Sequence, residues 1–129
     1  MSIEDRLADL GIDLPPVAKP VAAYVPAIQV GDQISTSGQL PLVSGSLPMT
    51  GLVGDQISQG DAAGQARVAA LNALAAAADV AGGVNNIRRV VRVVVYVAST
   101  ADFTAQPAVA NGASELFGEI FGDAGRHIH

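Results

Sequence analysis

Three stretches of the chain carry the patterns of β-strands. Residues 22–30 (AAYVPAIQV) and 32–40 (DQISTSGQL) are joined by Gly31-Asp32, which is typical of a β-hairpin. Residues 86–99 (NIRRVVRVVVYVAS) form a long β-branched run and predict a third strand. The hairpin and the third strand are separated by about 45 residues, so their pairing cannot be read from local spacing alone.

The third predicted strand has two different faces, because side chains of a strand point alternately to opposite sides. One face is aliphatic and consists of Val91, Val93, Val95 and Val97. The other is mixed and consists of Arg92, Val94, Tyr96 and Ala98. We expect helices to cover the aliphatic face and a second, more polar interface to form on the mixed face, where Tyr96 would pack.

Apolar residues at helical spacing predict three helices. The clearest spans residues 58–81 and is stopped by Gly82-Gly83. The apolar face of this helix consists of small side chains, mostly alanine: Ala62, Ala66, Ala69, Ala70, Ala73, Leu74 and Ala77. A second helix is expected from Asp102, acting as N-cap, to Phe121, with an apolar stripe of Leu116, Phe117, Ile120 and Phe121. A short helix capped by Ser2 is expected over residues 2–10.

Proline and glycine mark the connections between these elements. Residues 11–20 (GIDLPPVAKP) contain three prolines and predict an extended connector. Pro26 lacks a backbone N–H, which places the first strand at a sheet edge or beside a bulge. Ser44-Gly45 is the expected tip of a second, smaller hairpin in a turn-rich stretch.

The resulting order, β-β-α-β-α, predicts an α+β fold in which two helices cover one face of a mixed sheet in two layers. At 129 residues the chain is one domain, with residues 1–17 as an N-terminal extension and connector. A sheet of three long strands is thin. A further strand is therefore expected after the last helix, where the chain reads GRHIH.

Composition and charge narrow the classes of function. Half of the residues are hydrophobic but only 4% are aromatic, so the core is built from small side chains and oligomerisation is expected to complete its burial. The net charge of −5 argues against nucleic acid as a partner. Arg88, Arg89 and Arg92 are close in sequence, but strand alternation would send neighbours to opposite faces and prevent a basic patch.

Cellular location is predicted from what the sequence lacks. Without cysteine, disulfides, thiol catalysis and Cys–zinc sites are excluded. The acidic N-terminus MSIEDRLADLG does not match a secretory signal. Asn72, Asp79 and two glycines interrupt the most apolar stretch, which therefore reads as a buried helix and not as a membrane span. We expect a soluble cytoplasmic protein.

Common catalytic signatures are absent, and single residues carry weak signals. Ser37 has no evident base, and His127 with His129 provides two imidazoles where a metal needs three or four ligands, so we interpret the tail as solvated. Asn111 lies within a helix, where a polar contact from its side chain is plausible. Gly38, inside a strand pattern, indicates close approach by a ligand or another chain, and a Ser-Gly pair can offer a hydroxyl and backbone N–H groups to an anion.

The stretch AYVPAIQVGDQISTSGQLP resembles the first hairpin of the RidA/YjgF family of enamine/imine deaminases, in which a Tyr precedes an aliphatic strand, a Gly turn and T-S-G-Q. The stretches ALNALAAAADVAGGVNNIRRVVRVVVYVAS and DFTAQPAVANGASELFGEIFG are similar to the family's first helix, central strand and second helix. The resemblance covers roughly residues 18–127, and its T-S-G-Q hairpin is the more specific part.

The resemblance implies a chorismate-mutase-like fold and a homotrimer with sites in clefts between subunits. It implies hydrolysis of reactive 2-enamine or 2-imino acids to 2-keto acids and ammonia, without a metal or organic cofactor. By position, Tyr24, Ser37, Gly38 and Asn111 match the family's substrate-binding residues. An imine carbon needs an oriented water and fixed dipoles to hold the developing charge, which is consistent with these residue types.

The sequence departs from the family pattern at its end. The subgroup typically runs G-R-H-A-R-S, and its second Arg clamps the substrate carboxylate. Here His129 occupies the place of that Arg, and the family's final strands, one of which carries a Glu that positions water, are expected to be missing after residue 127. Two alternatives to a deaminase therefore stay open. The first alternative is a non-catalytic ligand-binding or regulatory member of the fold, whose relatives are also labelled translation inhibitor or endoribonuclease. The second is a truncated inactive product.

Overall fold

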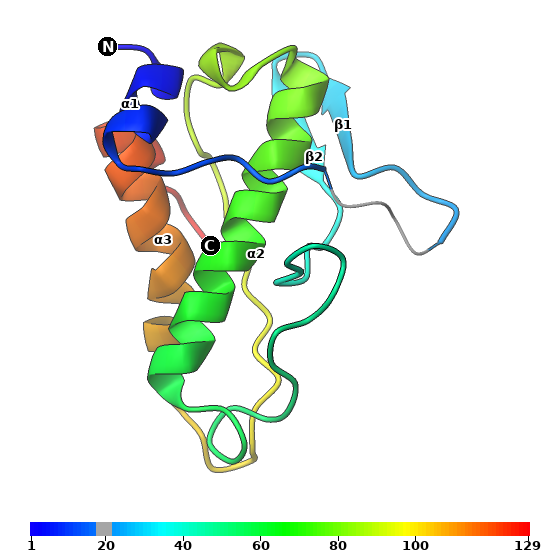
Figure 1. Cartoon of the computed structure of the whole chain (residues 1–129), viewed down its shortest axis with the longest axis vertical. Coiled ribbons are helices and arrows are strands. Elements are labelled where there is room, and N and C mark those ends of the chain that lie inside the picture. The colour runs from blue at the N-terminus through cyan, green and yellow to red at the C-terminus, as the bar shows by residue number, and fades with distance from the viewer. Residues whose placement is uncertain (18–21) are drawn as a thin grey trace.

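The computed structural model describes residues 1–17 and 22–129, and Figure 1 shows their arrangement. Residues 18–20, the end of the predicted connector, lie outside the described residues. The elements in chain order are α1 (Ile3–Asp9), β1 (Ala27–Val30), β2 (Gln33–Thr36), α2 (Gln59–Ala81), η1 (Val84–Asn86), α3 (Gln106–Phe121) and η2 (Gly122–Gly125). The predicted α+β class is confirmed, and the positions of all three predicted helices are confirmed in outline.

The helices α1 and α2 begin and end where the sequence predicts. Ser2 caps α1, where its hydroxyl accepts from the Asp5 N–H at 3.1 Å and the Asp5 side chain completes a capping box. Ser58 caps α2 in the same way by accepting from the Asp61 N–H at 3.1 Å. Gly82 ends α2 with φ of 82°, a conformation that glycine adopts without steric cost. Local capping therefore determines these boundaries.

The predicted start of α3 is wrong. The N-cap is Ala105, which makes no side-chain capping bond, and Pro107 lies in the first turn of the helix. Proline is well suited to that position because it has no N–H to satisfy and its φ is preset for a helix. Asp102 instead accepts a hydrogen bond from the Thr100 hydroxyl at 2.8 Å, in the turn that precedes the helix.

Strands β1 and β2 form the predicted antiparallel hairpin, with Ala27 opposite Thr36 and Val30 opposite Gln33. The strands are shorter than the sequence pattern, because β1 begins only after Pro26, which cannot donate to the ladder. The second predicted hairpin also forms. Its tip, Ser44-Gly45, has φ values of 52° and 83°, the positive values of a tight two-residue hairpin turn.

The predicted third strand is an extended segment, residues 87–99, without a continuous ladder. At one end Val53 bridges it, with the Val53 N–H donating to the Ala98 carbonyl at 2.9 Å. At the other end the tail runs parallel to it, with the Ile128 N–H donating to the Val91 carbonyl at 2.9 Å. Strand assignment needs a run of paired neighbours, and the described residues pair this segment only at isolated bridges.

The predicted valine face of this segment is wrong at Val91, which is 53% exposed. The inward positions are Val90, Val93, Val95 and Val97, which pack against the buried clusters. Two successive outward residues, Val91 and Arg92, interrupt the alternation. The alternation of side chains therefore shifts by one residue between residues 90 and 93, as in a bulge. Before this shift the even-numbered Val90 points inward, and after it the odd-numbered Val93, Val95 and Val97 do.

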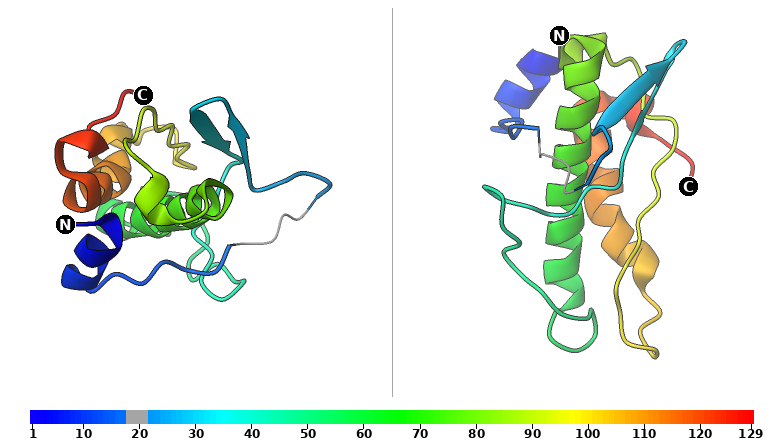
Figure 2. Two further views of the ribbon diagram at one scale, coloured as in Figure 1. Left: turned by 90° about the horizontal axis from the view of Figure 1, so that it is seen from above. Right: turned by 90° about the vertical axis from the view of Figure 1, so that its right-hand side faces the viewer.

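The core lies between α2 and α3 and beneath the extended segment. Its main cluster contains Leu74, Leu116, Phe117 and Ile120, and Leu116 is fully buried. The two helices approach most closely at Gly112, where an added Cβ would collide with the Ala63 carbonyl. Figure 2 shows the hairpin and the extended segment on one side of α2 and α1 on the other side. The hairpin and the extended segment form one predicted layer, and the helices form the other.

Candidate functional site

The predicted site residues Tyr24, Ser37 and Gly38 lie at the open end of the β1–β2 hairpin, away from its turn. We call this end the hairpin exit. The Ser37 N–H donates to the Pro26 carbonyl at 2.8 Å, and the Ser37 hydroxyl donates to the same oxygen at 3.2 Å. Two bonds to one carbonyl fix the serine beside the segment that carries Tyr24, whose side chain is 47% exposed. Tyr24 and Ser37 therefore lie at the same end of the hairpin, where Tyr24 is exposed and Ser37 is partly buried.

Gly38 has open space around it. A Cβ added at this position would meet no atom within 4 Å, and its φ is not in the left-handed region. Nothing in this chain therefore requires glycine here. The backbone N–H groups of Gly38 and Gln39 have no hydrogen-bond partner among the described residues. Two free donors beside a fixed hydroxyl are a chemical arrangement that suits an anionic group.

Asn72 is a residue of this region that sequence analysis missed. It lies on α2 with 3% of its surface exposed, and its Nδ2 donates to the Leu40 carbonyl at 3.0 Å and to the Leu42 carbonyl at 3.1 Å. These bonds attach the chain that follows Gly38 to the long helix. An asparagine in an otherwise alanine-rich helix was the available signal, because Asn is unfavourable in a helix unless its amide has a partner.

Asn111 lies apart from the hairpin. It is exposed on α3, and no hydrogen bond of its side chain is found among the described residues. Strands β1 and β2 pack against α2 and, among the described elements, make no contact with α3. The structure therefore brings Tyr24, Ser37 and Gly38 together and leaves Asn111 on a separate part of the same chain.

The tail is exposed at Ile128 and His129, but it is not a free end, because both histidines bind the fold. The Ser114 hydroxyl of α3 lies 2.8 Å from His127 Nε2, and His127 Nδ1 lies 3.1 Å from the Ile128 carbonyl. A carbonyl only accepts, so Nδ1 carries the hydrogen, and in the neutral ring Nε2 accepts from Ser114. His127 thereby connects the tail to α3 at Ser114, which lies about one helical turn after Asn111.

His129 continues this connection to the extended segment. Its Nδ1 donates to the Val93 carbonyl at 3.0 Å, and its ring meets His127 edge-to-face at a centroid distance of 5.0 Å. The second nitrogen, Nε2, is left as an acceptor in the neutral ring. The described residues contain no group of three or more side chains that could hold a metal ion.

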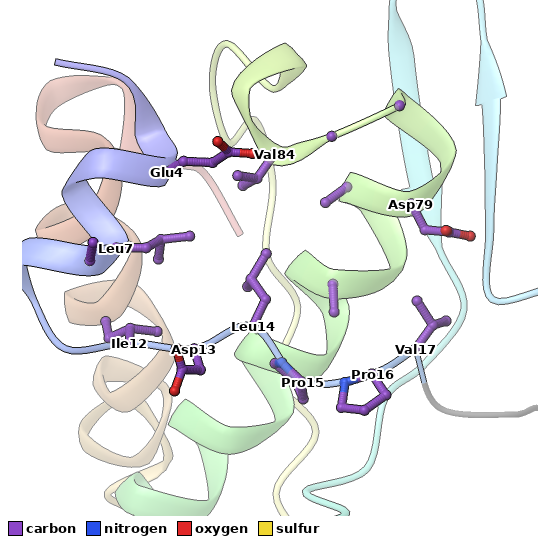
Figure 3. A pocket seen from close by; sticks show the side chains of 15 residues that line it. Glu4, Leu7, Ile12, Asp13, Leu14, Pro15, Pro16, Val17, Asp79 and Val84 are labelled. Atoms are coloured by element: carbon purple, nitrogen blue, oxygen red, sulfur yellow. The ribbon is translucent and has the colours of Figure 1, made fainter.

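A groove of about 690 Å³ lies on the opposite side of α2 from the hairpin, between that helix and the N-terminal segment (Figure 3). Its apolar lining includes Leu7, Leu14 and Val84, and Glu4 and Asp13 lie at its edges. None of the predicted site residues lines it. The groove is therefore separate from the candidate site, which has one half at the hairpin exit and the other at α3 and the tail.

The chain matches a known protein family. A family model described as "YjgF/chorismate_mutase-like, putative endoribonuclease" matches residues 4–129. The chain belongs to the YjgF/chorismate mutase-like family. The resemblance noted in the hairpin sequence is thereby confirmed, and the chorismate-mutase-like fold is confirmed with it.

Individual relatives agree with this YjgF assignment. The chain is 38% identical over 123 residues to Protein TCP17 of Trypanosoma cruzi, covering 95% of this chain and 77% of that protein. A crystal structure of a putative endoribonuclease from Shewanella oneidensis superposes with a TM-score of 0.88 at 32% identity, covering 99% of this chain and 87% of the other. A protein of unknown function from Agrobacterium tumefaciens gives a TM-score of 0.87 at 40% identity, covering 98% and 78%.

Across the described ranges 1–17 and 22–129, none of the helices is both long and apolar enough to cross a bilayer.

Proposed function

We propose that this YjgF-family protein is a RidA-type deaminase that hydrolyses small 2-enamine or 2-imino acids to 2-keto acids and ammonia. The observation that carries the proposal is the arrangement of groups at the hairpin exit. There the Pro26 carbonyl fixes the Ser37 hydroxyl next to the N–H groups of Gly38 and Gln39, which have no hydrogen-bond partner among the described residues. Such a cradle of donors suits the carboxylate of a 2-imino acid. Tyr24, on the same end of the hairpin, is proposed to border the substrate.

The second half of the proposed site comes from a neighbouring subunit of a homotrimer. Within one chain Asn111 and the hairpin belong to different parts of the surface, so a single chain does not close the site. The sheet face also exposes large apolar side chains, with Val30 at 71%, Ile128 at 66% and Tyr96 at 92%. Burial of such a face between copies would stabilise the oligomer.

In the proposed reaction the oxygen of water bonds to the imine carbon, and the C=N bond becomes a single bond. One proton of the water passes to the nitrogen, which gives a carbinolamine. Its nitrogen takes up a second proton and leaves as ammonia when the C–N bond breaks, while the hydroxyl gives up its proton and becomes the ketone oxygen. Asn111 is proposed to orient the water. The N–H groups of Gly38 and Gln39, next to Ser37, are proposed to stabilise charge that develops near the hairpin. His129 Nε2, an acceptor when Nδ1 donates to Val93, is proposed to receive a proton from water.

The test is keto-acid release from 2-aminoacrylate that is generated enzymatically in the assay. We expect the protein to accelerate release over buffer. Ser37→Ala should reduce the acceleration about tenfold or more, because the hydroxyl bond to Pro26 that helps to hold the Gly38 and Gln39 N–H groups in place is lost. Ser46→Ala is the matched control, since Ser46 lies in the exposed second hairpin and should leave the rate unchanged. A rate equal to buffer would exclude the deaminase.

A second candidate function, ligand binding without turnover, is favoured by one observation. His129 stands where the resembled subgroup has its carboxylate-clamping Arg, and its Nδ1 is already engaged by Val93. A neutral imidazole Nε2 in this state would accept and not donate, which weakens a carboxylate contact. Saturable pyruvate binding that Ser37→Ala removes, together with a buffer-level rate, would support the binder over the deaminase.

A further inference from the structure

The groove between the N-terminal segment and α2 has an aliphatic floor (Figure 3). We call it the N-terminal groove. Its most buried lining residues are Leu7 of α1, Ala75 and Ala78 of α2 and Val84 of η1, each at most 6% exposed. Residues 12–17 form a further wall, and no aromatic side chain of the described chain lines the groove. The floor therefore suits an alkyl chain, whose methylenes gain free energy when they leave water.

The N-terminal groove lies on the side of α2 that is opposite the hairpin (Figure 2). The apolar sheet face that the proposed trimer would bury includes Val30, Tyr96 and Ile128, and none of these residues lines the groove. The groove is therefore not part of the surface that the proposed assembly buries.

Two hydrogen bonds hold α1 at the edge of the groove. The Glu4 N–H donates to Asn85 Oδ1 at 2.9 Å, and Arg6 Nε donates to the Glu119 carbonyl of α3 at 2.9 Å. The second bond engages the only basic side chain of α1, and Arg6 does not line the groove. The wall formed by α1 is therefore fixed in place, and its guanidinium group is directed to α3.

Three carboxylates surround the N-terminal groove. Glu4 belongs to α1, Asp13 to the segment that follows it and Asp79 to α2, and Figure 3 places them at three separate edges. All three residues are exposed. Within the described ranges their carboxylates have no ion pair, and no lysine, arginine or histidine lines the groove. The edge of the groove is therefore negatively charged and has no counter-ion among its own lining residues.

The end of α2 adds to this negative potential. The helix has 23 residues and ends at the groove, where Gly82 and Gly83 are part of the lining. The C-terminal end of a helix carries a partial negative charge, and the last turn of α2 has no basic residue to offset it. A carboxylate ligand would be repelled here, whereas a cation would be attracted.

We propose that the N-terminal groove binds an aliphatic amine. The protonated amino group faces the carboxylates at the edge, and the alkyl chain lies on the aliphatic floor. The volume of about 690 Å³ is that of a site for a small molecule. The substrate proposed above is an anion at the hairpin exit, on the other side of α2, so this second site does not depend on the proposed deaminase.

The direct test is titration of the intact protein with n-hexylamine at pH 7, followed through the backbone amide signals by NMR spectroscopy. We expect saturable shifts at residues that line the groove. Hexanoate, which carries the opposite charge on a similar alkyl chain, should give none. Hexylamine should bind roughly tenfold more tightly than butylamine, the fold-change expected when two more methylenes are buried.

Substitution of the three acidic residues tests the charged part of the site. The triple variant Glu4→Gln/Asp13→Asn/Asp79→Asn should bind hexylamine about fivefold more weakly, because several exposed ion contacts are lost. Asp9→Asn is the matched control, since Asp9 is exposed on α1 but does not line the groove, and it should change the affinity less than about twofold. Circular dichroism confirms that the variants keep the fold.

The alternative occupant, a basic segment of a partner protein, is tested by a parallel titration with a peptide of lysine and leucine. Saturable binding of this peptide without binding of hexylamine would assign the groove to a protein partner and overturn the proposal. Equal affinity for hexylamine and hexanoate, or an unchanged affinity of the triple variant for hexylamine, would also overturn it.

Discussion

Asn72 shows how one side chain positions the candidate site. Its amide attaches the chain after Gly38 to α2 through two carbonyls, at 3.0 and 3.1 Å. Because the residue is 3% exposed, water cannot replace these bonds easily. Ser37 is held from the other side by Pro26. The two attachments lie on either side of the Gly38 and Gln39 N–H groups, which have no hydrogen-bond partner among the described residues.

Substitution of Asn72 by alanine should lower the free energy of unfolding by about 1–3 kcal/mol, because the Leu40 and Leu42 carbonyls lose their donor from the buried Asn72 amide. Asn111→Ala is the matched control, since Asn111 is exposed and has no described partner, and it should change stability by less than about 0.5 kcal/mol. Urea unfolding followed by circular dichroism measures both. Equal stabilities of the two variants would show that the Asn72 bonds do not hold the loop.

His127 illustrates what single residues reveal only in three dimensions. Two histidines at one end of a sequence gave no reason to expect more than a solvated tail. In the fold, His127 contacts Ser114, and His129 contacts Val93, so the tail is attached to both α3 and the extended segment. These contacts join residues 13 and 36 positions apart, which no local pattern encodes.

At the scale of elements, helices were predicted better than strands because their signals are local. Ser2, Ser58 and Gly82 each act within one turn of the helix they cap. The error at Asp102 arose because Pro107 determines the helix start more strongly than a distant cap does. The extended segment 87–99 depends on partners elsewhere in the chain, so neither its pairing nor the break at Val91 followed from its sequence.

The crossing of α2 and α3 provides a test at this scale. Gly112→Ala should destabilise the fold by about 1–3 kcal/mol, because its Cβ would collide with the Ala63 carbonyl and separate the helices. Gly118→Ala, in the same helix but facing open space, should instead raise stability by up to about 1 kcal/mol. Thermal denaturation of both variants gives the comparison, and a stabilising Gly112→Ala would contradict the described crossing.

At the scale of the whole molecule, the distribution of surfaces suggests an incomplete assembly. The hairpin and the extended segment expose apolar side chains such as Ile28, Val94 and Tyr96, although the sequence led us to expect Tyr96 to pack. The T-S-G-Q motif predicted the hairpin that carries Ser37 and Gly38, since hairpin geometry is local. The role of these residues in binding a substrate stays a prediction. In the proposed oligomer the meeting of Asn111 with this hairpin depends on two chains, which the pattern of a single sequence does not encode.

The central claim, a deaminase site shared between subunits, is tested most directly by mixing two inactive variants. Ser37→Ala and Asn111→Ala chains are combined after reversible dissociation, and keto-acid release is measured from the mixture. With sites formed by two different chains, random assembly restores both residues in roughly a quarter of the sites, so activity should return to about that fraction of wild type. If subunit exchange is confirmed by native mass spectrometry and activity does not return, the shared site is contradicted.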